Sequence, residues 1–288
     1  MDDQKQSRAT WPVALNALFI ALLAAAIEQV FHESVHGLTS LAVGGRWEVL
    51  NFWFAETGAA AGAPEWHTFL LKGGAAIANV LVGLACMMLF RARVARDRPL
   101  LRLFLMYSAA YHAMAGFGYL AFDPMFANAD SLGDWAHITM MLGGGWEVRI
   151  PIILVGGAGT VWVFFWIGRA ALRMVASGAM SERRGRTRSG LVTLIVPYVM
   201  VNLVFTVLAL FNALGTAATI LSIIKVWFGF IGLFWGFFIV FMWSPYRGPF
   251  GDETSLPHRL AVPWIVASVA LLAVCAAVLL PGLTIQGR

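Results

Sequence analysis

Charged residues are scarce in this sequence. They make up 12% of the 288 residues, whereas soluble domains carry about 25%. Hydrophobic residues make up 60%. Because such a chain cannot build a water-soluble surface, its composition excludes an ordinary soluble domain. We therefore expect a membrane protein, with the lipid bilayer as its surroundings.

Cysteine is also nearly absent. Cys86 and Cys275 both lie inside apolar runs, which excludes a disulfide framework and a CxxC metal site. The first apolar run leads straight to His32 and lacks the short core and cleavage site of a signal peptide. We expect this run to remain as a spanning helix.

Apolar segments of the length needed to cross a bilayer, about 20 residues, recur along the whole chain. They cover residues 13–43, 68–90, 101–122, 149–168, 190–212, 218–243 and 261–281. The sequence therefore predicts an all-α fold, a polytopic transmembrane bundle of about six or seven spans.

The arginines and lysines predict an orientation. With the N-terminus in the cytoplasm, 15 of the 20 fall on the cytoplasmic side, and the largest clusters follow residues 90 and 168. Lys225 is counted on the other side. This bias favours a multi-pass protein of the cell membrane with a cytoplasmic N-terminus. Because the arginines lie in loops between apolar segments, we expect no nucleic-acid partner despite the pI of 9.6.

Two connecting segments are unusual. Residues 45–66 are apolar and punctuated by glycine, which indicates extended or re-entrant structure, such as a membrane-associated hairpin lid. Residues 123–148 carry four acidic residues among apolar ones, more than a connecting loop requires.

The chemical motif of the chain is His32-Glu33-Ser34-Val35-His36, an HExxH sequence. On a helix, His32 and His36 project from one face and can bind one zinc ion, while Glu33 acts as general base. The alternative is a pair of histidines that only stabilise a helix bundle. Three ionisable groups within five residues of a spanning helix are costly in lipid, about 2.5–3.5 kcal/mol each, and a bound cation offsets that cost.

Glu28 lies one turn before His32 on the same face. It can accept a hydrogen bond from a ligand imidazole or line a water-filled entry to the site. The third zinc ligand must come from elsewhere. The candidates are His67, His112, Asp123, Asp130, Asp134 and His137. We favour Asp134, because Gly133 permits a turn after which the apolar stretch 135–142 can re-enter the bundle.

These motifs resemble those of the site-2 protease family of intramembrane zinc metalloproteases. HESVHG at 32–37 matches the family's HExxH helix, and Gly133-Asp134 is the best match to its aspartate motif, although Trp135 follows where the family has glycine. Residues 73–79 are similar to its Gly-Pro-x-x-Asn element, with alanine in place of the proline. The loop 45–66 stands where the family has a β-hairpin.

The resemblance implies a zinc metalloendopeptidase with His32, His36 and Asp134 as Zn²⁺ ligands, Glu33 as catalytic base and Asn79 as a substrate-binding residue. It divides the chain into a metalloprotease-like transmembrane core, residues 1–148, and additional transmembrane helices, residues 149–288. We expect a divergent member that cleaves membrane-spanning or membrane-adjacent protein segments.

Two other functions fit the same sequence. One is a hydrolase that acts on lipid with a single zinc ion. The other is a catalytically inactive membrane protein, such as one that binds client helices. Oxygenases with two irons use many more histidines than the six present. The sequence does not name the substrate or the oligomeric state.

Overall fold

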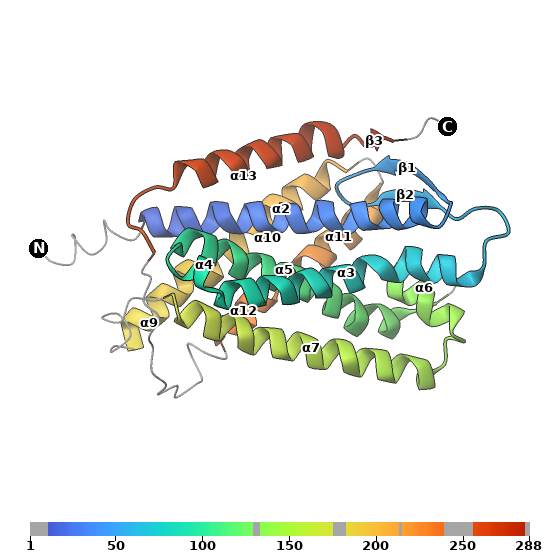
Figure 1. The fold of residues 1–288 in the computed structure, drawn as a ribbon, viewed down its shortest axis with the longest axis horizontal. Helices are drawn as coiled ribbons and strands as arrows, with labels where there is room; N and C mark the ends of the chain where they lie inside the picture. The colour runs from blue at the N-terminus through green and yellow to red at the C-terminus, as the bar shows by residue number, and fades with distance from the viewer. Residues whose placement is uncertain (1–10, 129–132, 175–182, 213–214, 239–255, 286–288) are drawn as a thin grey trace, which may run out of the picture.

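The computed structural model describes residues 11–128, 133–174, 183–212, 215–238 and 256–285. The chain is mostly helical, which confirms the all-α prediction. The helices lie alongside one another in an elongated bundle, with a small sheet at one end (Figure 1). The helices are α2 (Trp11–Ala42), α3 (Glu65–Arg91), α4 (Arg93–Arg96), α5 (Pro99–Phe122), η1 (Asp123–Phe126), α6 (Asp134–Met141), α7 (Trp146–Leu172), α9 (Arg183–Gly190), η2 (Leu191–Ile195), α10 (Val196–Leu210), α11 (Thr216–Gly229), α12 (Gly232–Phe237), α13 (Val262–Val274) and η4 (Cys275–Leu279).

Five helices are long and apolar enough to cross a membrane. They cover Trp11–Ala42, Glu65–Arg91, Trp146–Leu172, Thr187–Leu210 and Val262–Leu279. The two other predicted segments are helical as well. Residues 101–122 lie in α5, which is less apolar than these five helices. Residues 218–243 contain a shorter apolar helix, Ser222–Phe237, with a break between α11 and α12. The helical prediction holds for all seven segments within the described residues, whereas the number of spans stays a prediction.

The outer faces of the bundle are apolar. Only 22% of the apolar window of α7 and 17% of that formed by α13 and η4 are buried. Leu154 and Val155 on α7 and Val266 on α13 are each more than half exposed. Exposed apolar surface of this extent is unusual in a soluble monomer and typical of a lipid-facing helix.

Helix α5 is less apolar because it lies inside the bundle. It packs against α2, α3, α7, α11 and α12, and its polar side chains Tyr107, Tyr111 and His112 are buried. Small residues let α3 approach α5 closely: a Cβ added to Gly83 would lie 2.8 Å from the Ala113 backbone nitrogen. Close crossings of this kind depend on small side chains, and this one brings the middle of α3 against His112.

Residues 45–66 form the expected hairpin. Strand β1 (Arg46–Leu50) pairs antiparallel with β2 (Ala55–Gly58), with an irregularity between Trp47 and Val49. A third short strand, β3 (Leu283–Thr284), pairs with the other edge of β1. The Trp47 ring lies directly on Gly37 of α2, where any Cβ would collide with it. This contact fixes the hairpin beside the HExxH turn.

Helices from both halves of the sequence share one hydrophobic core. α10 and α13 pack on α2, and Phe205 of α10 contacts Phe52 of the hairpin with ring centroids 5.3 Å apart. The functional division at residue 148 stays a prediction, but the two parts are not separate bodies in the described structure.

Candidate metal centre

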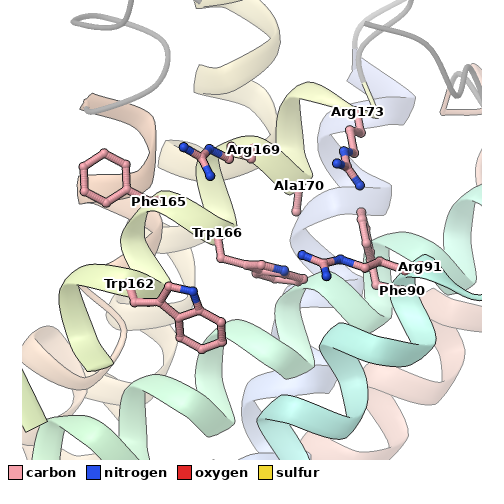
Figure 2. A pocket seen from close by; sticks show the side chains of 8 residues that line it. All are labelled: Phe90, Arg91, Trp162, Phe165, Trp166, Arg169, Ala170 and Arg173. Carbon is pink, nitrogen blue, oxygen red and sulfur yellow. The ribbon is translucent and has the colours of Figure 1, made fainter. Parts of the chain in front are cut away.

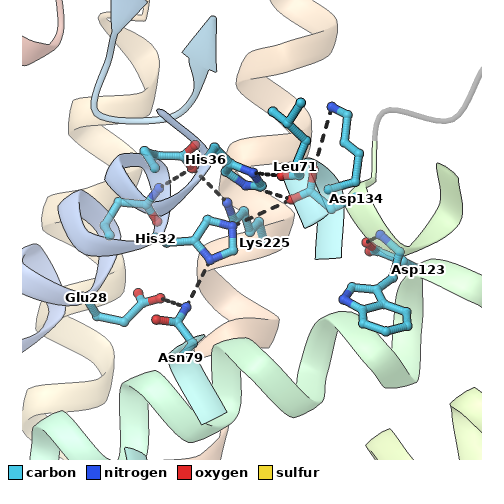
Figure 3. A network of polar contacts seen from close by, with 12 residues as sticks. Glu28, His32, His36, Leu71, Asn79, Asp123, Asp134 and Lys225 are labelled. Carbon is cyan, nitrogen blue, oxygen red and sulfur yellow. Dashed lines mark hydrogen bonds and ion pairs between the residues drawn. The ribbon is translucent and has the colours of Figure 1, made fainter. Parts of the chain in front are cut away.

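Three side chains from two helices converge near the hairpin end of the bundle (Figure 3). His32 and His36 lie one turn apart on α2, and Asp134 is the first residue of α6. The Asp134 Oδ2 atom is 3.1 Å from His36 Nε2 and 3.7 Å from His32 Nε2. One ligand atom from each residue lies within 4.8 Å of the others, so the group could hold a metal ion.

Asp134 reaches this position because α6 packs back against α3. Its residues Trp135 and Ile138 are buried, and Ile138 fits against Gly73 of α3, where a Cβ would meet its Cδ1 at 2.8 Å. The apolar stretch after Gly133 therefore re-enters the bundle as the sequence predicts.

Gly133 is needed for a different reason from the one expected. Its φ angle of −77° is open to any residue, so no left-handed turn is required. A Cβ there would instead lie 2.8 Å from the Asp123 carboxylate. Asp123 Oδ2 accepts a hydrogen bond from the Trp135 backbone N–H at 3.1 Å, which caps α6. Burial and the neighbouring Asp134 raise the pKa of Asp123 to about 7.

The His36 ring is held in the orientation that a ligand needs. Its Nδ1 lies 2.6 Å from the Leu71 carbonyl oxygen. Because a carbonyl can only accept, Nδ1 carries a proton, and Nε2 is the ring nitrogen that faces Asp134 and is left to bind a metal. A backbone carbonyl in this role is a common support for a metal-binding histidine.

The His32 ring is held between α3 and α5. It stacks on Tyr119 at a centroid distance of 4.9 Å. Its Nδ1 lies 2.9 Å from Asn79 Nδ2, and the same amide donates to Glu28 Oε1 at 3.0 Å. Glu28 thus contacts the imidazole only through Asn79. These contacts favour the supporting-acceptor role that was predicted for Glu28. Glu28 would exert this role through Asn79, the residue that was expected to bind substrate.

Asn79 is fully buried. Besides Glu28 and His32, it contacts His112, whose Nδ1 lies 2.8 Å from Asn79 Oδ1. All of its polar atoms are therefore engaged inside the protein. The substrate-binding role of Asn79 stays a prediction, and its contacts are those of a residue that orients His32.

Glu33 is buried beside the two histidines and is held by two partners. Gln29 Nε2 donates to its Oε1 at 3.1 Å, and Lys225 Nζ lies 3.4 Å from the same oxygen. Lys225 comes from α11, and its ammonium also lies 5.0 Å from the centre of the Tyr119 ring. Sequence reasoning missed this residue by counting it only as a charge on the outer side of the membrane. A lone lysine within an apolar helix was the signal that could have revealed it.

None of the other candidate ligands that the structure describes belongs to the group. His112 contacts Asn79, Asp123 caps α6, and His137 is exposed on α6. His67 lies in the first turn of α3 against the Trp66 ring. Asp130 lies outside the described residues.

Comparison with known proteins does not assign the chain to a family. No protein-family model matches the sequence, and no curated protein or solved structure matches it. Its function must therefore be inferred from the arrangement of the site.

Proposed function

We propose that this chain is a zinc-dependent intramembrane endopeptidase. The observation that carries the proposal is the meeting of the HExxH pair with an aspartate more than ninety residues later in the chain, within 4.8 Å of one another. Two imidazoles and one carboxylate, with a glutamate beside them, form the ligand set of a catalytic zinc site.

The donor set fits zinc in type, and two of its three separations are close to those of a zinc site. Bond lengths of about 2.0–2.2 Å place tetrahedral ligand atoms roughly 3.4 Å apart, and the Asp134 oxygen lies 3.1 and 3.7 Å from the two Nε2 atoms. Small movements of the side chains would therefore complete the site. Three protein ligands leave one coordination position for water or substrate.

Each side chain around this site has a chemical role in the proposal. Zinc, when bound, would polarise the peptide carbonyl. Glu33 would take a proton from the attacking water and deliver it to the leaving amine. Lys225 and Gln29 hold the Glu33 carboxylate in place. A fixed ammonium beside the general base holds that base in one orientation.

The substrate class follows from the surroundings of the site. Five helices are long and apolar enough to cross a membrane, and we place the chain in the cell membrane as a multi-pass protein. A transmembrane or membrane-adjacent protein segment is then the substrate that can reach His32 laterally. The outer edge of β2, which has no strand partner in the described sheet, is a surface where an unwound substrate could add a further strand.

The test combines metal content with hydrolysis. We expect about one zinc ion per purified chain, which His36→Ala should lose while the fold is retained. Glu33→Gln should keep the zinc and lower peptide hydrolysis by about 10²–10⁴-fold, because it removes only the base. Circular dichroism of both variants serves as the folding control.

The outcomes separate the proposal from its rivals. Equal zinc in the wild type and His36→Ala would contradict a metal site at this position. Zinc retained together with full activity in Glu33→Gln would reject the peptidase mechanism. A zinc protein that hydrolyses lipid esters and no peptide would be the lipid hydrolase, and a zinc-free protein would be a non-enzymatic binder.

A further inference from the structure

A second polar site lies at the opposite end of α3, some 20 residues and about 30 Å along the helix from Leu71. There α3 and α7 enclose a cavity of about 130 Å³ (Figure 2). Its walls include three arginines, Arg91 from α3 and Arg169 and Arg173 from the end of α7. The remaining walls are mainly aromatic. The cavity therefore combines concentrated positive charge with an apolar lining.

The three arginines have no acidic partner in the described part of the chain. None of the ion pairs or hydrogen bonds among the described residues engages their guanidinium groups. Arg149, near the other end of α7, differs: its guanidinium donates to the carbonyls of Gly144, Pro124 and Ala127. Within the described part of the chain, the donors of these three arginines are therefore available for a ligand.

A buried arginine lies behind the floor of the cavity. Phe90 is 1% exposed, and the guanidinium of Arg102 lies 4.7 Å from the centre of its ring. Arg102 is itself 1% exposed. Phe90 thus separates the cavity from a buried arginine side chain.

The aromatic walls are graded in exposure. Trp166 is buried, whereas Trp162 and Phe165 are 45% and 41% exposed on the outer face of α7. Tryptophan near the end of an apolar helix is typical of the membrane–water interface. A ligand here can contact the arginines with a charged group and the outer rings with an apolar one.

We propose that this cavity binds the phosphate group of an anionic glycerophospholipid. A phosphodiester offers oxygens that match the paired donors of arginine, and basic cavities between helices on the cytoplasmic side of a membrane bind lipid headgroups. The excess of arginine on the cytoplasmic side of a membrane protein explains why arginines occur at this end of the bundle. It does not explain why three of them line one cavity. The inference rests on the proposed membrane location and is independent of the metal site.

The test is a titration of the full-length protein in detergent, followed by native mass spectrometry. The probes are phosphatidylglycerol, phosphatidylcholine and inorganic phosphate. We expect the wild type to retain phosphatidylglycerol in preference to phosphatidylcholine. Arg91→Gln with Arg173→Gln should weaken phosphatidylglycerol binding roughly thirtyfold, since each arginine near a charged headgroup contributes about a five- to sixfold gain.

The matched control is Arg93→Gln with Arg98→Gln. These arginines are exposed at the same end of the bundle and outside the cavity, so the control removes the same charge. It should bind phosphatidylglycerol as the wild type does. Zinc content, measured in every variant, reports on the other site and should not change.

Three results would overturn the proposal. Equal weakening in both double variants would mean that general surface charge attracts the lipid. Equal retention of the two lipids would mean that the headgroup charge is not recognised. Displacement of phosphatidylglycerol by inorganic phosphate would assign the cavity to free phosphate. Should the double variant fail to fold, Arg173→Gln alone, whose residue is exposed, gives the same comparison with a five- to sixfold expected change.

Discussion

Asn79 places a chemical requirement on the proposed zinc site. Binding through His32 Nε2 requires a proton on Nδ1, and an N–H cannot donate to the Asn79 N–H that now lies 2.9 Å away. The amide must therefore present Oδ1 to His32 and turn Nδ2 toward His112. Oδ1 then also faces Glu28, whose carboxyl must carry a proton to donate to it. Asn79 can exchange the two groups by a half-turn about its Cβ–Cγ bond, because its side chain ends in one acceptor and one donor. A side chain with two donors or two apolar groups at its end could not do so.

This requirement separates the two roles of Asn79. If the residue orients His32, Asn79→Leu should lower zinc affinity about 10–100-fold, the usual effect of removing a partner of a metal ligand. Asn79→Asp, which keeps an acceptor for His32, should retain most of it. If Asn79 instead binds substrate, zinc affinity should be unchanged and KM should rise in Asn79→Leu. Competition with a chelator measures the affinity.

Lys225 and Glu33 form an ion pair, and we expect each charge to stabilise the burial of the other. Lys225→Met should destabilise the fold by about 1–3 kcal/mol, because it leaves the buried Glu33 carboxylate without its cation. The double variant Lys225→Met with Glu33→Gln should recover part of this loss, since both charges are then gone. The free energy of unfolding of the wild type, the two single variants and the double variant, measured by thermal unfolding, gives the interaction energy of the pair. Simple additivity of the two changes would mean that the pair contributes nothing.

At the scale of elements, the short helix α6 decides whether the metal site forms. Gly133→Ala should push α6 away from Asp123, because the added Cβ would lie 2.8 Å from that carboxylate. We expect zinc affinity to fall about tenfold or more as Asp134 moves. Gly118→Ala in α5 is the control, since nothing lies within 4 Å of its Cβ. A variant at Gly133 with normal zinc affinity would show that α6 tolerates the shift.

The elements were predictable where the sequence carries a periodic or spacing signal. The apolar runs gave the helices, the glycine-punctuated loop gave the hairpin, and the HExxH spacing gave one face of the candidate site. The position of Asp134 followed from the apolar stretch after it. The cap from Asp123 to Trp135 depends on the path of residues between them, which no local pattern specifies.

Lys225 shows the limit of reasoning along the chain. Its contact with Glu33 joins residues 192 positions apart, and their pairing depends on how α11 packs on α5. A charge count treats a lysine as a topology signal wherever it stands. Within the helix Thr216–Gly229 the same lysine forms an ion pair inside the bundle. Only the three-dimensional arrangement shows that its partner is Glu33.

For the whole molecule, the distribution of arginine predicts orientation. Reporter fusions after residues 95 and 185 should report a cytoplasmic location, because these positions lie in the arginine-rich segments that follow α3 and α7. α4 and α9 lie at the same end of the bundle (Figure 1), as a common side requires. A fusion after residue 60, in the hairpin region at the other end, serves as the control and should report the outside. Opposite readings at 95 and 185 would require a different number of spans.

The pairing of β1 with β3 has a consequence for the order in which the protein is made. The Asn51 side chain donates to the carbonyl of Leu280, 229 positions later, and Val49 pairs with Thr284. Synthesis adds about 5–20 residues per second, so the ribosome needs roughly 10–50 s after the hairpin before its last strand exists. During that interval the HExxH helix is already complete, whereas Lys225 and β3 have yet to arrive. A nascent chain therefore carries the motif well before it carries Lys225 and the last strand of the sheet.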